Sequence, residues 1–170
     1  APSSFILGSI SGNVTEDLNN DDNGDVGLSG VVITLKDSSG GTIATTTTDP
    51  DGNYAFFDLP KGVYTIVESN PVRYLDVSDV EGSRNDSTII GLILDSGENA
   101  TDQNFVDEKC RVVNGTVQED TDNNDVGDTP VAGVSVELYE TGSSQLILIA
   151  SAVSDSNGRY SFVCVRPGKY

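Results

Sequence analysis

The alternation of apolar and polar positions along the chain predicts short β-strands. In VVITL (31–35), the apolar residues Val31, Ile33 and Leu35 recur at every second position, which is the period of a half-buried strand. The stretch TIATTTT (42–48) is rich in β-branched residues, whose stiff χ1 torsions suit a pleated sheet. Turn residues separate such segments at intervals of roughly 8–12 residues, a spacing typical of β-sandwiches. We therefore expect an all-β sandwich rather than a parallel sheet.

Two dipeptides mark tight turns between the expected strands. Asp51-Gly52 and Asn157-Gly158 are residue pairs that tolerate the positive φ angles of a two-residue hairpin turn. An aromatic segment follows each of them, YAFF in the first case and YSFV in the second, and we expect it to be the return strand. Both dipeptides are interpreted as structural, with no chemistry assigned to them.

The chain repeats itself. Residues 12–35 match residues 115–138 at an offset of 103 without a gap, and eleven of the 24 positions are identical. A second block, residues 49–64, matches residues 155–170 at an offset of 106. The difference between the two offsets falls between the blocks, where a hairpin loop absorbs it. The sequence therefore contains two copies of one domain.

The two copies differ in extent. The first continues past its Gly-x-Tyr strand through enough residues for two or three more strands, whereas the second stops at Tyr170 within the equivalent strand. Either the chain continues, or another molecule supplies the missing strands, with the apolar N-terminal segment SSFILGSI as a candidate donor. The expected organisation is an N-terminal donor strand or linker (1–9), a complete sandwich (10–108) and a second sandwich without its C-terminal strands (109–170).

Composition narrows the partners and the chemistry. Acidic residues outnumber basic ones by 27 to 9, which gives a formal net charge of −18 at pH 7. Such a charge repels nucleic acid and anionic membrane surfaces, and it favours a divalent cation that relieves the repulsion between carboxylates. No apolar run is long enough to span a membrane. The chain has no His, the usual general base, and no nucleophile–base arrangement is visible, so we expect no enzyme.

Oxygen-bearing side chains recur at alternate positions of an acidic loop in both copies. Counted from Asp17 or Asp120, positions 1, 3, 5 and 9 are Asp or Asn in both loops, while position 7 is Asn23 in one and Val126 in the other. A backbone carbonyl ligand at position 7 explains this tolerance, and hard oxygen ligands indicate Ca²⁺. The alternative is a solvated loop of Asx-turns. The candidate metal-binding positions are Asp17, Asn19, Asp21, Asn23, Asp25, Asp120, Asp122, Asn124, Val126 and Asp128.

The loop departs from that of an EF-hand. Position 6 is Asp22 or Asp125 instead of Gly, and position 12 is Leu28 or Val131 instead of a bidentate Glu. Flanking helices are not expected either, because β-branched segments lie on both sides. A further ligand has to come from water or from a nearby acid, for which the candidates are Asp22, Glu16 and Asp49.

The repeated unit resembles a known family. The stretch from Gly12 to Glu68 is similar to the SdrD B-like repeat, a relative of the Cna B-type domain, through the DxNxD loop and the motifs L-x-G-V, T-D-x-D-G-x-Y-x-F and L-P-x-G-x-Y. The resemblance implies tandem transthyretin-like (Ig-like) β-sandwiches in extracellular or cell-surface proteins, where they act as stalks or spacers. It also implies calcium binding in this loop, through Asp17, Asn19, Asp21 and Asp25 and through Asp120, Asp122, Asn124 and Asp128.

The two cysteines and the sequons are further candidate sites. Cys110 and Cys164 are compatible with one disulfide in a secreted protein or with two buried thiols. Asn-x-Ser/Thr sequons are weak evidence for a glycoprotein in a chain this rich in Asn, Ser and Thr, although Asn85 and Asn99 lie in polar stretches that we expect to be exposed. The candidate glycosylation sites are Asn13, Asn85, Asn99 and Asn114.

Together these features indicate a non-enzymatic structural module outside the cell or at its surface. We expect a calcium-stiffened stalk or filament subunit whose partners are neighbouring copies or further repeats of the same chain, polymerising by strand exchange. The alternative is an adhesin module that binds a carbohydrate or protein ligand. The absence of Trp counts against sugar recognition. Neither nucleic acid nor membrane insertion is expected.

Overall fold

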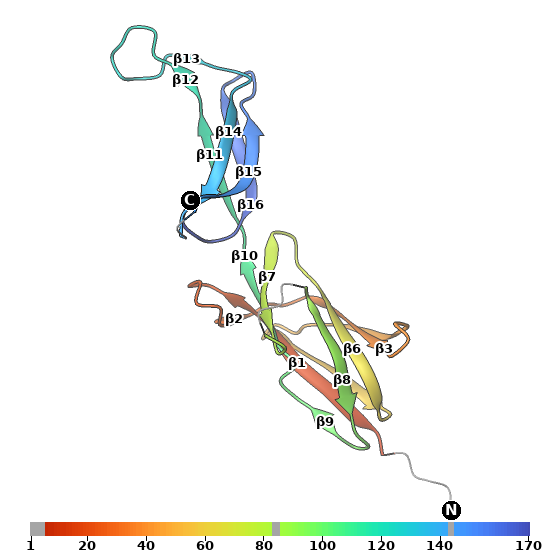
Figure 1. The fold of residues 1–170 in the computed structure, drawn as a ribbon. Helices are drawn as coiled ribbons and strands as arrows, with labels where there is room; N and C mark the ends of the chain where they lie inside the picture. The colour runs from red at the N-terminus through yellow and green to blue at the C-terminus, as the bar shows by residue number, and fades with distance from the viewer. Residues whose placement is uncertain (1–5, 83–85, 143–144) are drawn as a thin grey trace, which may run out of the picture. The chain divides into compact units, whose positions relative to one another are not determined.

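A computed structural model describes residues 6–82, 86–142 and 145–170 (Figure 1). All regular elements in these residues are β-strands, which confirms the predicted all-β fold. Contacts divide the chain into two compact units, Ala1–Lys109 and Cys110–Tyr170, and each is described by itself. Within the described part of the chain there is no helix that could cross a membrane.

Unit one is a sandwich of two sheets (Figure 1). The first sheet has the order β2-β1-β10-β7, and β5 and β9 also pair with β1. It comprises β1 (Gly8–Asp17), β2 (Val26–Gly27), β5 (Asn53–Leu59), β7 (Tyr74–Asp79), β9 (Asn99–Ala100) and β10 (Phe105–Lys109). The second sheet has the order β4-β3-β6-β8 and comprises β3 (Val32–Asp37), β4 (Thr42–Thr47), β6 (Gly62–Ser69) and β8 (Thr88–Leu94).

The core of unit one lies between the two sheets and follows the predicted alternation. Val31, Ile33 and Leu35 are buried, as the two-residue period requires. From the first sheet, Ile10 and Phe105 join the same cluster. Burying apolar side chains between two sheets is the main favourable contribution to such a fold, at roughly 25 cal/mol per Å² of apolar surface.

Two features of unit one differ from the sequence-based expectation. β1 begins at Gly8, so the last two residues of the predicted N-terminal segment belong to the first sheet, where Gly8 pairs with Leu59 and Ser9 with Asn99. A Cβ at Gly8 would lie 2.1 Å from the backbone oxygen of Glu98, so only glycine fits there. In addition, β1 runs parallel to β9 and β10, which alternation alone does not predict.

The Asp-Gly turn is present, but it is not a hairpin between paired strands. Gly52 has a φ of 84°, as expected of such a turn residue. The strands on either side are β4, which pairs with β3, and β5, which pairs with β1. The turn therefore carries the chain from one sheet to the other, because turn residues permit a reversal without selecting the pairing partner.

Unit two repeats the first part of unit one. Its strands form three pairs, β11 (Arg111–Thr116) with β16 (Arg159–Val165), β12 (Gln118–Glu119) with β13 (Thr129–Pro130), and β14 (Ser135–Glu140) with β15 (Ile147–Val153). By repeat position β14 corresponds to β3, which has neighbours on both sides, whereas β14 pairs with β15 alone among the described strands. Its core is small, with Leu138, Phe162 and Val165 buried together.

Candidate metal centre in the acidic loops

Each acidic loop is the tip of a short antiparallel ladder. The first loop connects β1 to β2, where Thr15 pairs with Gly27 and Glu16 with Val26. The second connects β12 to β13 in the same way. Both ladders end where the run of Asp and Asn residues begins, so the two strands fix the ends of the loop and bring its first and last acids close together.

Asp17, at position 1 of the first loop, organises the loop around its carboxylate. It is the last residue of β1 and is only 3% exposed. Its Oδ1 accepts the backbone N–H groups of Asn20 at 2.7 Å and Asn19 at 3.1 Å, and its Oδ2 accepts that of Asp22 at 2.8 Å. Hydrogen bonds to a charged acceptor are stronger than neutral ones. A single carboxylate therefore holds the turn in shape.

Asp120 does the same in the second loop, although it is exposed to solvent. Its Oδ1 accepts N–H groups from Asn123 at 2.7 Å and Asn124 at 3.2 Å, and its Oδ2 accepts that of Asp125 at 2.8 Å. Slight desolvation raises the pKa of Asp120, but these N–H donors outweigh it and lower the pKa overall. The carboxylate is therefore ionised at neutral pH and available to a cation.

The residues at position 6 have a conformational role in both copies. Asp22 and Asp125 each have a φ of 64°, and Asn20 and Asn123 at position 4 have φ values of 63° and 62°. Asp and Asn are the non-glycine residues that adopt this left-handed conformation most readily. Position 6 thus has the backbone geometry for which an EF-hand uses Gly, and its N–H points to the acid at position 1.

The acid at position 9 closes each loop. Asp25 Oδ2 accepts the N–H of Leu18 at 2.8 Å. In the second copy, Asp128 Oδ2 accepts both the N–H of Thr121 at 2.9 Å and its hydroxyl at 2.8 Å. These two bonds from Thr121 hold the pKa of Asp128 below its usual value. The two loops therefore share one framework of hydrogen bonds, repeated residue by residue.

In the second loop the acids at positions 1, 3 and 9 converge. Carboxylate oxygens of Asp120, Asp122 and Asp128 all lie within 4.8 Å of one another. Asn124 at position 5 is held against them, because its Nδ2 donates to Asp122 Oδ2 at 2.9 Å. Ca²⁺ prefers oxygen ligands at 2.3–2.6 Å, so two ligands of one ion are at most about 4.6–5.2 Å apart, and oxygens this close together can share an ion. The donor set of this loop fits a calcium ion.

The first loop has the same framework with a different distribution of charge. Position 3 is Asn19, and its Nδ2 donates to Asp21 Oδ2 at 3.2 Å. Within the described residues, the acids of this loop do not form a cluster of three like that of the second loop. At position 7, Asn23 and Val126 donate their N–H groups to the side-chain oxygen of position 5 in their own loops. The carbonyl ligand at position 7 stays a prediction.

The additional acids proposed as ligands are engaged elsewhere. Glu16 Oε2 accepts the hydroxyl of Tyr74 at 2.9 Å. Asp49 Oδ1 accepts the N–H groups of Asp51 and Asn53 at 2.9 and 2.8 Å, which shapes the Asp-Gly turn. Neither contact brings the acid to the first loop, so Asp22 or water stays the predicted source of a further ligand.

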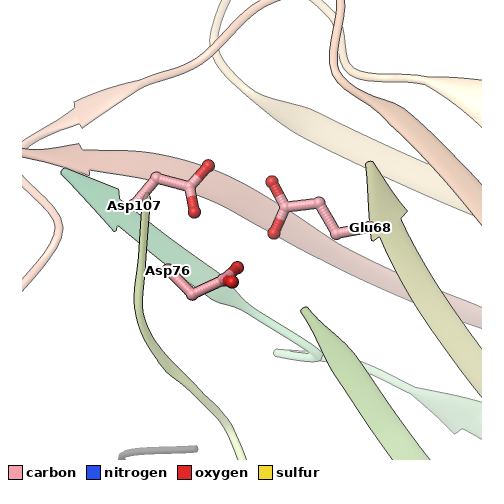
Figure 2. Close-up of side chains that lie close together, drawn as sticks. All are labelled: Glu68, Asp76 and Asp107. Atoms are coloured by element: carbon pink, nitrogen blue, oxygen red, sulfur yellow. The ribbon is translucent and has the colours of Figure 1, made fainter. Parts of the chain in front are cut away.

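A second acidic group, which is absent from the predicted sites, lies inside unit one (Figure 2). Glu68 on β6, Asp76 on β7 and Asp107 on β10 point toward one another, with oxygens within 4.8 Å. A signal was present in the strand period. Glu68 has the parity of the buried residues Tyr64 and Ile66, and an acid at a core position is an exception that calls for a partner.

Comparison with known sequences identifies the repeated unit. Residues 8–109 match the SdrD B-like domain. The chain belongs to this family. The chain is 32% identical over 165 residues to serine-aspartate repeat-containing protein F of Staphylococcus epidermidis. It is 30% identical over the same length to serine-aspartate repeat-containing protein D of Staphylococcus aureus. Each match covers 92% of the chain but only 10% and 12% of those proteins.

A solved structure supports the fold alone. The Bacillus anthracis TIE protein aligns with a TM-score of 0.50 at 20% identity, covering 93% of the B-like chain and 27% of that protein. The family places the B-like chain outside the cell or at the cell surface, as the sequence predicted. The chain spans about a tenth of the length of the curated relatives that it matches.

The cysteines of the B-like chain are joined. A disulfide links Cys110, the first residue of unit two, to Cys164 on β16, across a sequence separation of 54 residues. Cys164 has a φ of 54°, and its counterpart Asp58 in unit one has a φ of 56°. The bond is thus added to a backbone geometry that both units share. Closing a long loop restricts the unfolded chain and typically stabilises a domain by about 2–4 kcal/mol.

The sequons occupy different surroundings. Asn99 and Asn114 are exposed, and Asn13 is half-buried in β1. Asn99 Oδ1 accepts the hydroxyl of Ser9 at 2.7 Å. Asn85 lies outside the described residues. Accessibility therefore favours Asn99 and Asn114 as acceptors, and glycosylation stays a prediction.

Proposed function

We propose that the protein is a non-enzymatic structural module, a stalk or filament segment of tandem B-like domains that is stiffened by calcium in its acidic loops. The observation that carries the proposal is the repeated loop framework. Both copies anchor the turn on the acid at position 1 and close it on the acid at position 9. Such a loop is arranged before an ion binds, so binding costs little additional ordering.

Calcium in these loops would act on rigidity rather than on chemistry. Each loop joins two strands that are otherwise held by a two-residue ladder, β1 with β2 and β12 with β13. An ion that binds acids from both ends of the loop ties these strands together. A ligand that binds only the native state stabilises it by about 2.7 kcal/mol at one hundred times its Kd. Stiff loops of this kind suit a spacer between functional domains.

A thermal melt of the whole chain tests calcium binding in the loops. We expect the melting temperature to rise in Ca²⁺ relative to EDTA, and the rise to shrink in the double variant Asp17→Asn with Asp120→Asn. Each substitution removes the charge but keeps the shape of the anchoring residue. Asp51→Asn is the matched control, because Asp51 is an exposed acid of the turn outside both loops. An equal rise in melting temperature in the wild type and the double variant would mean that the loops are solvated Asx-turns without a bound ion.

We further propose that unit two receives strands from a neighbouring copy or from further repeats. Its β14 pairs with β15 on one side only among the described strands, and Val153 on β15 is 65% exposed. An unpaired strand edge with apolar surface is a template for an added strand. Sedimentation over a range of concentrations tests this step, and a strictly monomeric chain throughout would contradict it while leaving the calcium proposal intact.

A further inference from the structure

The buried acidic group of unit one joins the two sheets of the sandwich. Glu68 comes from β6 in the four-stranded sheet, whereas Asp76 and Asp107 come from β7 and β10, which are neighbours in the other sheet. Asp76 and Asp107 are register partners across that pair. Figure 2 shows the three carboxyl groups directed into the space between the strands. The group is therefore positioned by three strands of regular structure and not by a loop.

Two of these carboxyl groups are buried without a donor. Glu68 is 4% exposed and Asp107 is fully buried. None of their four carboxyl oxygens has a hydrogen-bond partner within the part of the chain that the structure describes. Burying a charge without a partner costs several kcal/mol even after relaxation. An unpaired acid this deep in a sandwich therefore requires a neutralising group, either a proton or a cation.

The surroundings add negative charge. Glu16 is the register partner of Asp107 in the parallel pair of β1 and β10, and neighbouring residues in register share a face of the sheet. Burial raises the pKa of Glu68, and repulsion from Asp107 raises it further. Asp76 is held in place by the hydroxyl of Ser87, which donates to its Oδ1. The two buried acids Glu68 and Asp107 thus lie beside two half-buried ones, Glu16 and Asp76.

The geometry and the chemistry of the donors fit one hard cation. The three oxygens lie within 4.8 Å of one another, which is close enough for one Ca²⁺ to bind all three, because ligands 2.3–2.6 Å from one ion are at most about 4.6–5.2 Å apart. All donors are carboxylate oxygens, with neither nitrogen nor sulfur, and this set favours hard cations such as Ca²⁺ and Mg²⁺ over Zn²⁺ or Cu²⁺. Ca²⁺ also tolerates irregular geometry and bidentate carboxylates, whereas Mg²⁺ requires a near-ideal octahedron and retains its waters.

We propose that Glu68, Asp76 and Asp107 bind one Ca²⁺ inside unit one, at a site separate from the acidic loop. The separation follows from the strand alternation. Asp107 pairs with Glu16, and the next pair is Glu108 with Asp17, so Asp17, the anchor of the loop, points to the opposite face of the sheet from Asp107. An ion at the buried site links β6 to β7 and β10, and it clamps the two sheets to each other.

Calcium binding by the whole chain tests the proposal. The background is the double variant Asp17→Asn with Asp120→Asn, and Ca²⁺ is the probe in isothermal titration calorimetry and equilibrium dialysis. We expect this background to retain one bound Ca²⁺ per chain and to lose it when Asp107→Asn is added. Asn keeps the volume of Asp and removes only the charge. The control Asp51→Asn in the same background should retain the ion.

The outcomes distinguish this site from the loops. If the wild type binds Ca²⁺ and the background binds none at millimolar concentration, the buried site is overturned and a shared proton neutralises the acids, while the loop proposal stands. If the wild type binds Ca²⁺ and the background binds as many ions, the loop proposal fails, and loss of an ion on adding Asp107→Asn still supports the buried site. If neither protein binds Ca²⁺ at millimolar concentration, both proposals are overturned. Retention of the last ion after Asp107→Asn also overturns the buried site.

Two further measurements keep the test decisive should Asp107→Asn fail to fold. Glu68→Gln neutralises the acid from the opposite sheet and should remove the same ion. Independently, a Ca²⁺ titration of the folded background followed by amide NMR should shift the backbone signals of Ser69, Val77 and Glu108, which adjoin the three acids. Signals that stay unchanged up to millimolar Ca²⁺ would overturn the proposal without any variant at the site.

Discussion

The two acidic groups of unit one are opposite solutions to the same electrostatic problem. In the loop, Asp17 is surrounded by backbone N–H groups that satisfy both of its oxygens. Between the sheets, Glu68 and Asp107 face each other with no donor from the described chain. The loop carboxylate is thus stabilised by the protein itself, whereas the interior carboxylates depend on something that the protein must take from solution.

The comparison shows that acidic composition alone does not define a site. The loop holds its shape through hydrogen bonds, so calcium would add rigidity to a turn that is already formed. The buried acids destabilise unit one until they are neutralised, so an ion there changes the free energy of unfolding directly. The same residue type therefore supports folding in one place and opposes it in the other.

The largest expected effect comes from removing the anchor of the loop. Asp17→Ala deletes the acceptor of several backbone N–H groups and should lower the free energy of unfolding of the calcium-free chain by about 2 kcal/mol, since hydrogen bonds to charged groups contribute about 1.5–3 kcal/mol. Urea denaturation in EDTA measures this. A variant as stable as the wild type would show that the turn forms without its anchor.

The next effect should have the opposite sign. In EDTA, Asp107→Asn removes a buried charge that has no donor and relieves its repulsion with Glu68, so the free energy of unfolding should rise by on the order of 1 kcal/mol. The same denaturation experiment applies, with Asp51→Asn as the control for lost net charge. Destabilisation by Asp107→Asn in EDTA would mean that the buried acids are favourably paired as they stand.

A smaller effect should separate the two loops. Asp120→Ala removes the same kind of anchor as Asp17→Ala, but Asp120 is exposed and Asp17 is buried. Water can replace the lost acceptor at the exposed position, so we expect Asp120→Ala to cost less stability than Asp17→Ala. Hydrogen exchange of the loop amides in each unit measures the difference. Equal losses in the two loops would indicate that burial of Asp17 has no energetic role.

The stability of the calcium-free chain should decrease on both sides of an optimum pH, for a different reason on each side. Without calcium, Glu68 has a raised pKa in the folded state, so the folded chain binds more protons than the unfolded chain, and stability should fall as pH rises above about 4.5. Asp128 has a lowered pKa, so its contribution is present above its ordinary value of 3.8 and is lost as pH falls through and below it. Melting temperatures across pH in EDTA should therefore show a maximum at mildly acidic pH. In Glu68→Gln the decline above that maximum should be weaker.

Local patterns predicted much of the fold and the framework of the loops. Alternation identified the buried face of Val31, Ile33 and Leu35, and the repeat located both loops. The parallel pairing of β1 with β10 could not be predicted, because their register partners are about 90 residues apart in sequence and no local preference selects such a partner. For the same reason the pattern could not show that the strands around the Asp-Gly turn belong to different sheets.

The buried acids could not be predicted as a group from the pattern of any single strand. Glu68 and Asp107 each occupy an inward position of their own strand, which the two-residue period makes visible. Their proximity depends on how two sheets pack, which is information that no single segment contains. Asp22 is the contrasting case. Its left-handed φ is a local property, and the absence of Gly at that position could have been read as a conformational substitution.

The parallel pairing of β1 and β10 has a mechanical consequence. β1 opens unit one and β10 closes it, and Lys109 is followed directly by Cys110 of unit two. A pull on the two ends of unit one drags these strands past each other along their length. The ladder from Val14–Phe105 to Asp17–Glu108 is then loaded in shear, and its bonds must break together instead of unzipping one after another. We therefore expect unit one to resist tension along the chain better than a domain whose terminal strands unzip.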